Sequence, residues 1–200
     1  MNPISLAEYI LFTFSDKSRG GITPMKLQKL LYYVKAWGLV AGHDLVDGDF
    51  LRWDYGPVNE AVWKKYNGRS PITPQPPSSH PKGKEKKLID FIVYNYVQYN
   101  ALTLSSMTHE EKPWKNTPPN DVIPDDLMLE YYRERPFAKN FASDEEWQGF
   151  VPVDSDFSHS FALDMTKEDA EEVNTYSSFE EYKRHQEEAS EDFESWFNDL

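Results

Sequence analysis

The 200-residue sequence contains no cysteine. Disulfide frameworks, thiolate metal sites and thiol nucleophiles are therefore excluded, and a reducing cytoplasm suits such a chain. No apolar run approaches the roughly 20 residues that a membrane-spanning helix needs. The segment from Met1 to Phe14 lacks the basic start and the small-residue cleavage site of a signal peptide. We expect a cytoplasmic protein without membrane association.

Motifs for catalysis and cofactor binding are also missing. The nine glycines form no nucleotide-binding fingerprint, and no serine lies in a Gly-x-Ser-x-Gly elbow. The histidines are scattered, with no His-Glu-x-x-His pair for zinc; they are His43, His80, His109, His159 and His185. We expect no enzyme activity and no cofactor.

The net charge of -13 is divided unevenly along the chain. Residues 1–120 carry 15 Lys/Arg against 11 Asp/Glu, whereas residues 121–200 carry 6 against 23. The first part holds most apolar residues and is expected to be the folded domain. The acidic part favours basic protein surfaces and disfavours nucleic acid, whose phosphates it repels.

Helical periodicity and capping signals predict a mainly α-helical first domain with at most short strands. Ser5 and Glu8 form a capping box, and Thr23 followed by Pro24 starts a second helix. Five prolines between Pro71 and Pro81 predict an exposed loop. The expected helices cover residues 5–15, 24–41, 58–66, 84–99, 103–109 and 125–135, with a short strand at 50–53.

The helix over residues 24–41 is predicted to be central. Leu27, Leu30, Leu31 and Val34 recur at helical spacing, and the neighbouring tyrosines widen the apolar arc, so that more than one side is covered. Three lysines fall largely outside this stripe: Lys26, Lys29 and Lys35. A second lysine group, Lys82 to Lys87, opposes the dipole of the helix it starts. It either meets a partner or keeps the loop soluble.

Residues 137–200 are predicted to form a smaller acidic α(+β) extension beyond a domain at 1–136. Short strands are expected at 150–153 and 160–163, and helices at 166–173 and 178–198. The last helix is acidic and amphipathic, with Phe193, Trp196 and Phe197 on its apolar side. It docks either on its own domain or on a partner.

Two segments allow a structural or a functional interpretation. His109 lies close to Glu111 and could form an acid/base pair; alternatively, Thr108 or His109 bonds to local backbone, Pro113 stops the helix and Trp114 fills the core. Around Gly56-Pro57, the backbone constraints indicate a turn into a helix. Exposed aromatic residues beside that turn, Trp53 and Tyr55, could instead anchor a partner.

Three motifs together resemble the Panacea (DUF4065) family. They are Pro24 to Tyr33 followed by Ala36-Trp37, then Trp53-x-Tyr55-Gly56-Pro57-Val58, then Thr108-His109-x-Glu111-x-Pro113-Trp114. The resemblance covers about residues 5–135. The matched positions serve as a domain signature: Leu27, Gln28, Lys29, Leu30, Tyr32, Tyr33, Trp37, Tyr55, Gly56, Pro57, Val58, Thr108, His109, Glu111, Pro113 and Trp114.

Proteins of this family are antitoxins, often phage-associated, whose mostly helical domain is paired with many unrelated toxins. The resemblance implies a non-enzymatic protein that neutralises a cognate toxin, encoded by an adjacent gene, through direct protein–protein binding. Alternatives are a proteolytic adaptor that delivers the toxin to a AAA+ protease and another phage-associated interaction protein. The resemblance is also compatible with homo-oligomers. Nucleic acid is expected as a partner only in an autoregulatory complex.

Overall fold

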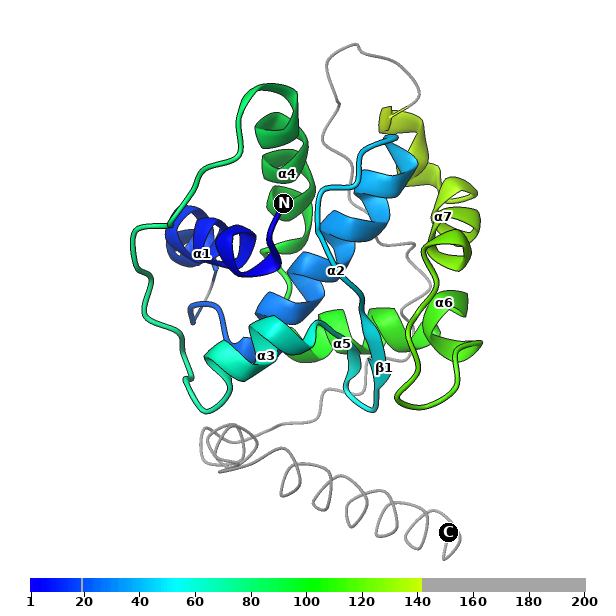
Figure 1. Cartoon of the computed structure of the whole chain (residues 1–200), viewed down its shortest axis with the longest axis horizontal. Helices are drawn as coiled ribbons and strands as arrows, with labels where there is room; N and C mark the ends of the chain where they lie inside the picture. Colours follow the sequence, from blue (N-terminus) through cyan, green and yellow to red (C-terminus); the bar gives the residue numbers. More distant parts are fainter. Residues whose placement is uncertain (19, 142–200) are drawn as a thin grey trace, which may run out of the picture. The chain divides into compact units, whose positions relative to one another are not determined.

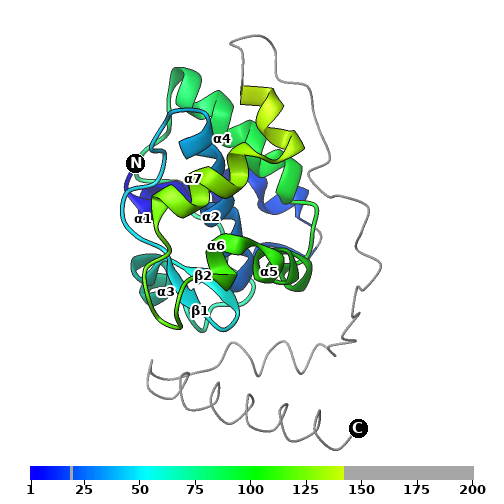
Figure 2. The ribbon, with the colours of Figure 1, turned by 90° about the vertical axis from the view of Figure 1, so that its right-hand side faces the viewer.

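The computed structural model describes residues 1–18 and 20–141 (Figures 1 and 2). Within them, the chain is mainly helical and contains one small two-stranded sheet, as the sequence predicts. The helices are α1 (Pro3–Phe14), α2 (Pro24–Val40), α3 (Glu60–Tyr66), α4 (Gly83–Tyr96), α5 (Ala101–Glu110), α6 (Lys112–Lys115) and α7 (Asp125–Arg133), with 3-10 helices η1 (Ser15–Lys17) and η2 (Pro136–Phe141).

Helix α2 is the centre of the described part. It contacts α1, α3, α4, α5, α7 and the sheet, and Figure 1 shows it passing between α1 and α4 on one side and α7 on the other. The Thr23 side chain caps its first turn with Pro24 at the start, and the chain leaves through Gly42 at a φ of 76°. The prediction of a central, many-sided helix is confirmed.

The sheet is a hairpin of β1 (Leu51–Trp53) and β2 (Gly56–Val58). The strands pair antiparallel, with Leu51 opposite Val58 and Trp53 opposite Gly56. Backbone bonds from the segment 120–123 cover the other edge of β1, between Arg52 and Asp121 and between Ile123 and Phe50. The hairpin would not be stable by itself, because each of its strands has only three residues.

Several predicted helix ends were wrong. Helix α1 begins at Pro3 and is capped by Asn2, whose Oδ1 accepts from the N–H groups of Ile4 and Ser5. The expected capping box is absent, because Glu8 reaches instead to Lys65 and Ser78. The helix expected at 58–66 begins at Glu60, since residue 58 belongs to β2, and the helix expected to reach residue 99 ends at Tyr96.

The three lysines of α2 are buried, which the sequence pattern did not predict. Lys26 donates to the carbonyl of Val97 at the C-terminal end of α4, at 2.6 Å. Lys35 lies 2.9 Å from the carboxylate of Asp125 at the start of α7. Lys29 reaches the hairpin. Each ammonium therefore joins α2 to a different neighbouring element.

The Pro71 to Pro81 segment is a loop without helix or strand, as expected. At the other end, Phe137 packs into the core, with its ring 4.7 Å from that of Trp37 and stacked on Phe91 at 5.5 Å. The strands and helices predicted between 150 and 198 lie outside the described residues. The domain boundary at 136/137 stays a prediction.

Candidate functional site

Lys29 lies in the N-terminal half of α2 and points its ammonium at the hairpin. Its Nζ donates to the carbonyl of Pro57 at 3.1 Å, and the residue is only 1% exposed. Gly56 lies directly against it: a Cβ there would stand 2.7 Å from Lys29 Nζ and 2.6 Å from Thr108 Oγ1. The absence of a side chain at Gly56 therefore lets the lysine of one motif and the threonine of another meet the hairpin.

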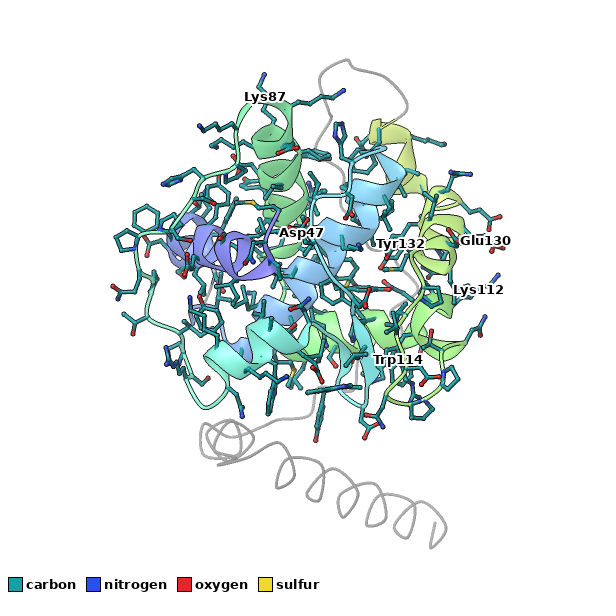
Figure 3. The ribbon with its side chains drawn as sticks, in the orientation of Figure 1. Asp47, Lys87, Lys112, Trp114, Glu130 and Tyr132 are labelled. Carbon is teal, nitrogen blue, oxygen red and sulfur yellow. The ribbon has the colours of Figure 1, made fainter. Side chains whose placement is uncertain are left out.

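Glu111, just after α5, is buried among aromatic residues. Tyr33 donates its hydroxyl to Oε1 at 3.1 Å, and Tyr132 donates to Oε2. Figure 3 shows Tyr132 on the side of α7 that faces α2, while Glu130 of the same helix points away. The ring of Tyr33 stacks on Tyr96 at 3.9 Å. We call Lys29, Tyr33, Thr108, Glu111 and Tyr132 the buried cluster.

The hairpin turn is held by side chains from α5 and α6. His109 places Nδ1 2.6 Å from the carbonyl of Ser105 and Nε2 against the carbonyl of Asp54. Trp114 donates Nε1 to the carbonyl of Trp53 at 3.0 Å, and its ring lies 4.1 Å from that of His109. The guanidinium carbon of Arg52 lies over the Trp114 ring, 4.0 Å from its centroid. We call Arg52, His109 and Trp114 the hairpin clamp.

Gln28 of α2 holds the junction between β2 and α3. Its Oε1 accepts from the backbone N–H of Asn59 at 2.8 Å, and its Nε2 donates to the carbonyl of the same residue at 3.2 Å. The Asn59 side chain in turn accepts from Val62 N at the start of α3. The three sequence motifs thus meet in space around one hairpin.

Residues 27–115 match the family model described as antitoxin SocA-like, Panacea domain. The chain carries a SocA-like Panacea domain. All 16 signature positions fall inside the matched segment, and the buried cluster and hairpin clamp account for how its three motifs come together. Comparison with curated proteins found no match, and comparison with solved structures found none.

Burial dominates the electrostatics of the buried cluster. It lowers the pKa of Lys29 from 10.5 to about 7, while the negative charge of Glu111 acts in the opposite direction. It raises the pKa of Glu111 from 4.5 to about 7, against the stabilising hydroxyl donors of Tyr132 and Tyr33. Within the Panacea domain, Glu111 therefore loses its negative charge as the pH falls below about 7, and Lys29 loses its positive charge as the pH rises above about 7.

The predicted alternative of a His109–Glu111 acid/base pair has no support in this geometry. Both ring nitrogens of His109 contact backbone carbonyls, and both carboxylate oxygens of Glu111 accept from tyrosines. Burial also lowers the pKa of His109. Across residues 1–18 and 20–141, no group of three or more His, Asp or Glu residues could hold a metal ion.

The structural interpretation of the third motif is largely confirmed. Thr108 Oγ1 donates to the carbonyl of Ser105 at 2.8 Å. Pro113 follows the end of α5 and lies in the first turn of α6, and its carbonyl accepts from Thr117 Oγ1. Trp114 is half-buried and packs against the core from its edge, rather than filling it.

The expectation of exposed aromatic anchors in the second motif is wrong for Trp53. It is 4% exposed and packs edge-on against Trp63, at 5.5 Å, so its side chain is not available at the surface. Tyr55 is half-buried, and its carbonyl accepts from Ser105 Oγ at 3.0 Å. The predicted contact residues Phe193, Trp196 and Phe197 lie outside the described residues.

The remaining signature positions belong to the core of the Panacea domain. Trp37 packs on Tyr132 at 4.7 Å and donates Nε1 to the hydroxyl of Tyr96 at 2.7 Å. Tyr32 is fully buried and meets Phe50 edge-on at 5.6 Å. The leucines and the valine are buried as well: Leu27, Leu30 and Val58.

Sequence reasoning missed Tyr132 and the burial of Lys29. Tyr132 lies four residues after Met128 on the inner side of α7, so helical spacing could have placed it in the core. Its role as a donor to Glu111 depends on a residue 21 positions away. Lys29 has no comparable signal, because its charge alone predicts an exposed side chain.

Proposed function

We propose that this protein is a cytoplasmic antitoxin that neutralises a cognate protein toxin by direct binding. The observation that carries the proposal is the match of residues 27–115 to the antitoxin SocA-like Panacea domain. An antitoxin needs no catalytic centre of its own. Within the described residues, no helix is long and apolar enough to cross a membrane.

The buried state of the signature supports a division of labour within the protein. Most signature side chains are buried or bonded to the hairpin, so they maintain the fold and leave the partner surface to other residues. We assign the toxin contact to Tyr55 at the hairpin turn and to the acidic residues 121–200, with Phe193, Trp196 and Phe197 as apolar anchors. This acidic region would attract a basic toxin surface and increase the association rate.

Co-expression with the neighbouring gene tests the proposal. The neighbouring product alone should arrest growth, and this protein should restore growth and co-purify with it at a fixed ratio. A neighbouring product that is harmless alone would contradict the antitoxin assignment. Restored growth without a stable complex would contradict direct binding.

A triple substitution tests the assigned contact residues. Changing Phe193, Trp196 and Phe197 together to Ala should weaken toxin binding at least about a hundredfold, because buried aromatic anchors contribute most of the binding energy at interfaces. Tyr94→Ala is the matched control, since Tyr94 is an aromatic residue 65% exposed on α4. Equal binding by the triple variant and the control would remove these residues from the interface.

Toxin half-life separates direct neutralisation from delivery to a protease. In direct neutralisation, the toxin persists in the complex, and its half-life is unchanged or longer when this protein is present. A shortened half-life that depends on a AAA+ protease would replace direct neutralisation by the adaptor mechanism.

A further inference from the structure

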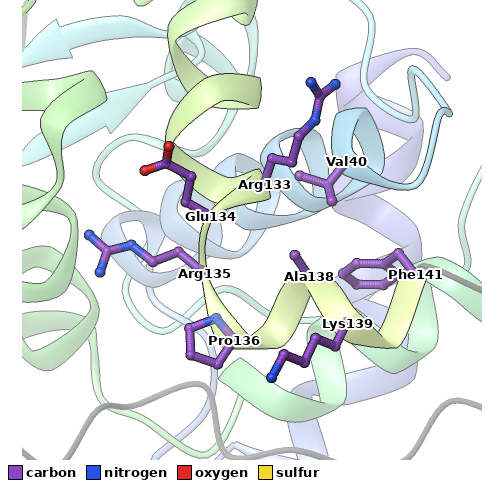
Figure 4. Close-up of a pocket in the computed structure, with 8 residues that line it drawn as sticks. All are labelled: Val40, Arg133, Glu134, Arg135, Pro136, Ala138, Lys139 and Phe141. Atoms are coloured by element: carbon purple, nitrogen blue, oxygen red, sulfur yellow. The ribbon is translucent and has the colours of Figure 1, made fainter.

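A cavity of about 500 Å³ opens between the C-terminal ends of α2 and α7 and the short helix η2. Its apolar lining includes Val40, Ala138 and Phe141, which we call the apolar floor. Figure 4 shows these three side chains grouped together, with Val40 facing η2 from the end of α2. The cavity lies outside the hairpin clamp and shares no residue with the buried cluster.

The rim of this cavity is cationic. Among the described residues that line it, Arg133, Arg135 and Lys139 are cationic and Glu134 is anionic. In Figure 4, the charged ends of Arg133, Glu134 and Arg135 all extend outward from the apolar floor. Arg135 is held at the edge by stacking on Tyr131, at 4.0 Å. A ligand that fits this cavity would combine negative charge with an apolar side chain.

We propose that the cavity binds residues 144–150 of this same chain. This segment reads Asp-Glu-Glu-Trp-Gln-Gly-Phe, so three consecutive carboxylates precede two aromatic residues, Trp147 and Phe150. The carboxylates match the cationic rim, and the aromatic rings match the apolar floor. This segment belongs to the acidic residues 121–200 proposed above to attract the toxin, but it does not include the apolar anchors Phe193, Trp196 and Phe197.

Chain connectivity favours this occupant over a separate acidic peptide. The segment follows Phe141, which itself lines the cavity, by only two intervening residues. An extended chain advances about 3.3 Å per residue, so the segment is long enough for Trp147 to reach Val40, which lines the same cavity as Phe141. A tether this short gives an effective concentration on the order of millimolar, and weak individual contacts then suffice for binding.

The absence of cysteine permits a direct test in the full chain. Val40→Cys combined with Trp147→Cys should form an intrachain disulfide in a glutathione redox buffer. Tyr94→Cys with Trp147→Cys is the control, because Tyr94 is exposed on α4 and does not line the cavity. Equal disulfide yields in the two variants overturn the proposal. A disulfide-linked dimer as the main product also overturns it, since the occupant would then be a second copy.

Charge reversal tests the recognition chemistry. Arg133→Glu and Lys139→Glu are introduced together into the Val40→Cys/Trp147→Cys variant. They should lower the equilibrium constant for disulfide formation about tenfold, because two attractive pairs with the carboxylates of residues 144–146 become repulsive. Adding Asp144→Lys with Glu145→Lys should restore most of it. Lys84→Glu with Lys87→Glu makes the same charge change at α4 and should leave the yield unchanged. A yield indifferent to the rim charges overturns the proposal.

Discussion

Gly56 shows why a glycine belongs to the Panacea signature at this position. Its φ of 94° lies in the left-handed region that other residues resist. Independently, the space where a Cβ would stand is taken by Lys29 Nζ and Thr108 Oγ1. Backbone conformation and close packing therefore select the same residue.

We predict that Gly56→Ala lowers the free energy of unfolding by about 3 kcal/mol, combining backbone strain with displacement of the lysine. Gly42→Ala is the control, because Gly42 has a φ of 76° but open space around it. That control should cost only about 1–2 kcal/mol, the strain alone. Urea denaturation measures both. Equal losses would show that the contact with Lys29 and Thr108 has no energetic consequence.

Lys29 and Glu111 are expected to depend on each other energetically. Lys29→Met and Glu111→Gln should each destabilise by about 1–3 kcal/mol, because the first leaves the Pro57 carbonyl without its donor and the second weakens the bonds from Tyr33 and Tyr132. The double variant should be more stable than the sum of the two losses predicts, by at least about 1 kcal/mol. A double-mutant cycle by urea denaturation tests this.

The ion pair of Glu8 and Lys65, at 2.5 Å, provides the comparison cycle. Both side chains are partly exposed there, so the coupling energy should stay below about 1 kcal/mol. Additive losses for Lys29 and Glu111 would contradict an electrostatic coupling inside the buried cluster.

At the scale of elements, the hairpin depends on side chains from outside it. Its strands are only three residues long. Lys29 reaches Pro57 from α2, while His109 and Trp114 reach the carbonyls of Asp54 and Trp53 from α5 and α6. Hydrogen-bond donors from three helices therefore replace the stability that a wider sheet would provide.

We predict that His109→Gln loosens the hairpin while the helices stay intact. Loss of the two carbonyl contacts should cost about 1–3 kcal/mol. Amide hydrogen exchange should accelerate at residues 51–58 and 120–123, and exchange within α4 should change little. Toxin neutralisation should survive at a temperature where the variant is folded. Loss of neutralisation with unchanged exchange would instead support a direct role for His109.

At the scale of the whole molecule, the buried cluster should impose a pH dependence on stability. The folded-state pKa of Glu111 is raised from 4.5 to about 7, so its contribution is fully present below pH 4.5 and is lost as the pH rises to about 7. The folded-state pKa of Lys29 is lowered from 10.5 to about 7, so its contribution is present above pH 10.5 and is lost as the pH falls to about 7. Together they predict a minimum of stability near neutral pH.

Urea denaturation between pH 5 and 9 measures this dependence, and each limb should have a slope of up to about 1.4 kcal/mol per pH unit. Glu111→Gln should remove the acidic limb, and Lys29→Met should remove the alkaline one. If both variants keep the pH profile of the original protein, other groups cause it.

The sequence was most informative where the signal is local. The start of α2 at Thr23-Pro24 and its end at Gly42 follow from capping chemistry within a few residues. The apolar stripe from Leu27 to Val34 identified the central helix. The predicted start of α1 was wrong because Ser5 and Glu8 have the spacing of a capping box, although Asn2 is the actual cap. In the folded chain, Glu8 accepts instead from Lys65 and Ser78, which the local sequence does not reveal.

The sequence by itself determined the helical class, the central helix and the membership of residues spread over three motifs in one signature. Tertiary structure alone decided that Lys29 is buried, that Glu111 bonds to Tyr33 and Tyr132, and that His109 holds the hairpin instead of pairing with Glu111. The physical reason is that periodicity and caps act over a few residues, whereas the neutralisation of a buried charge depends on groups that the chain brings together from distant positions.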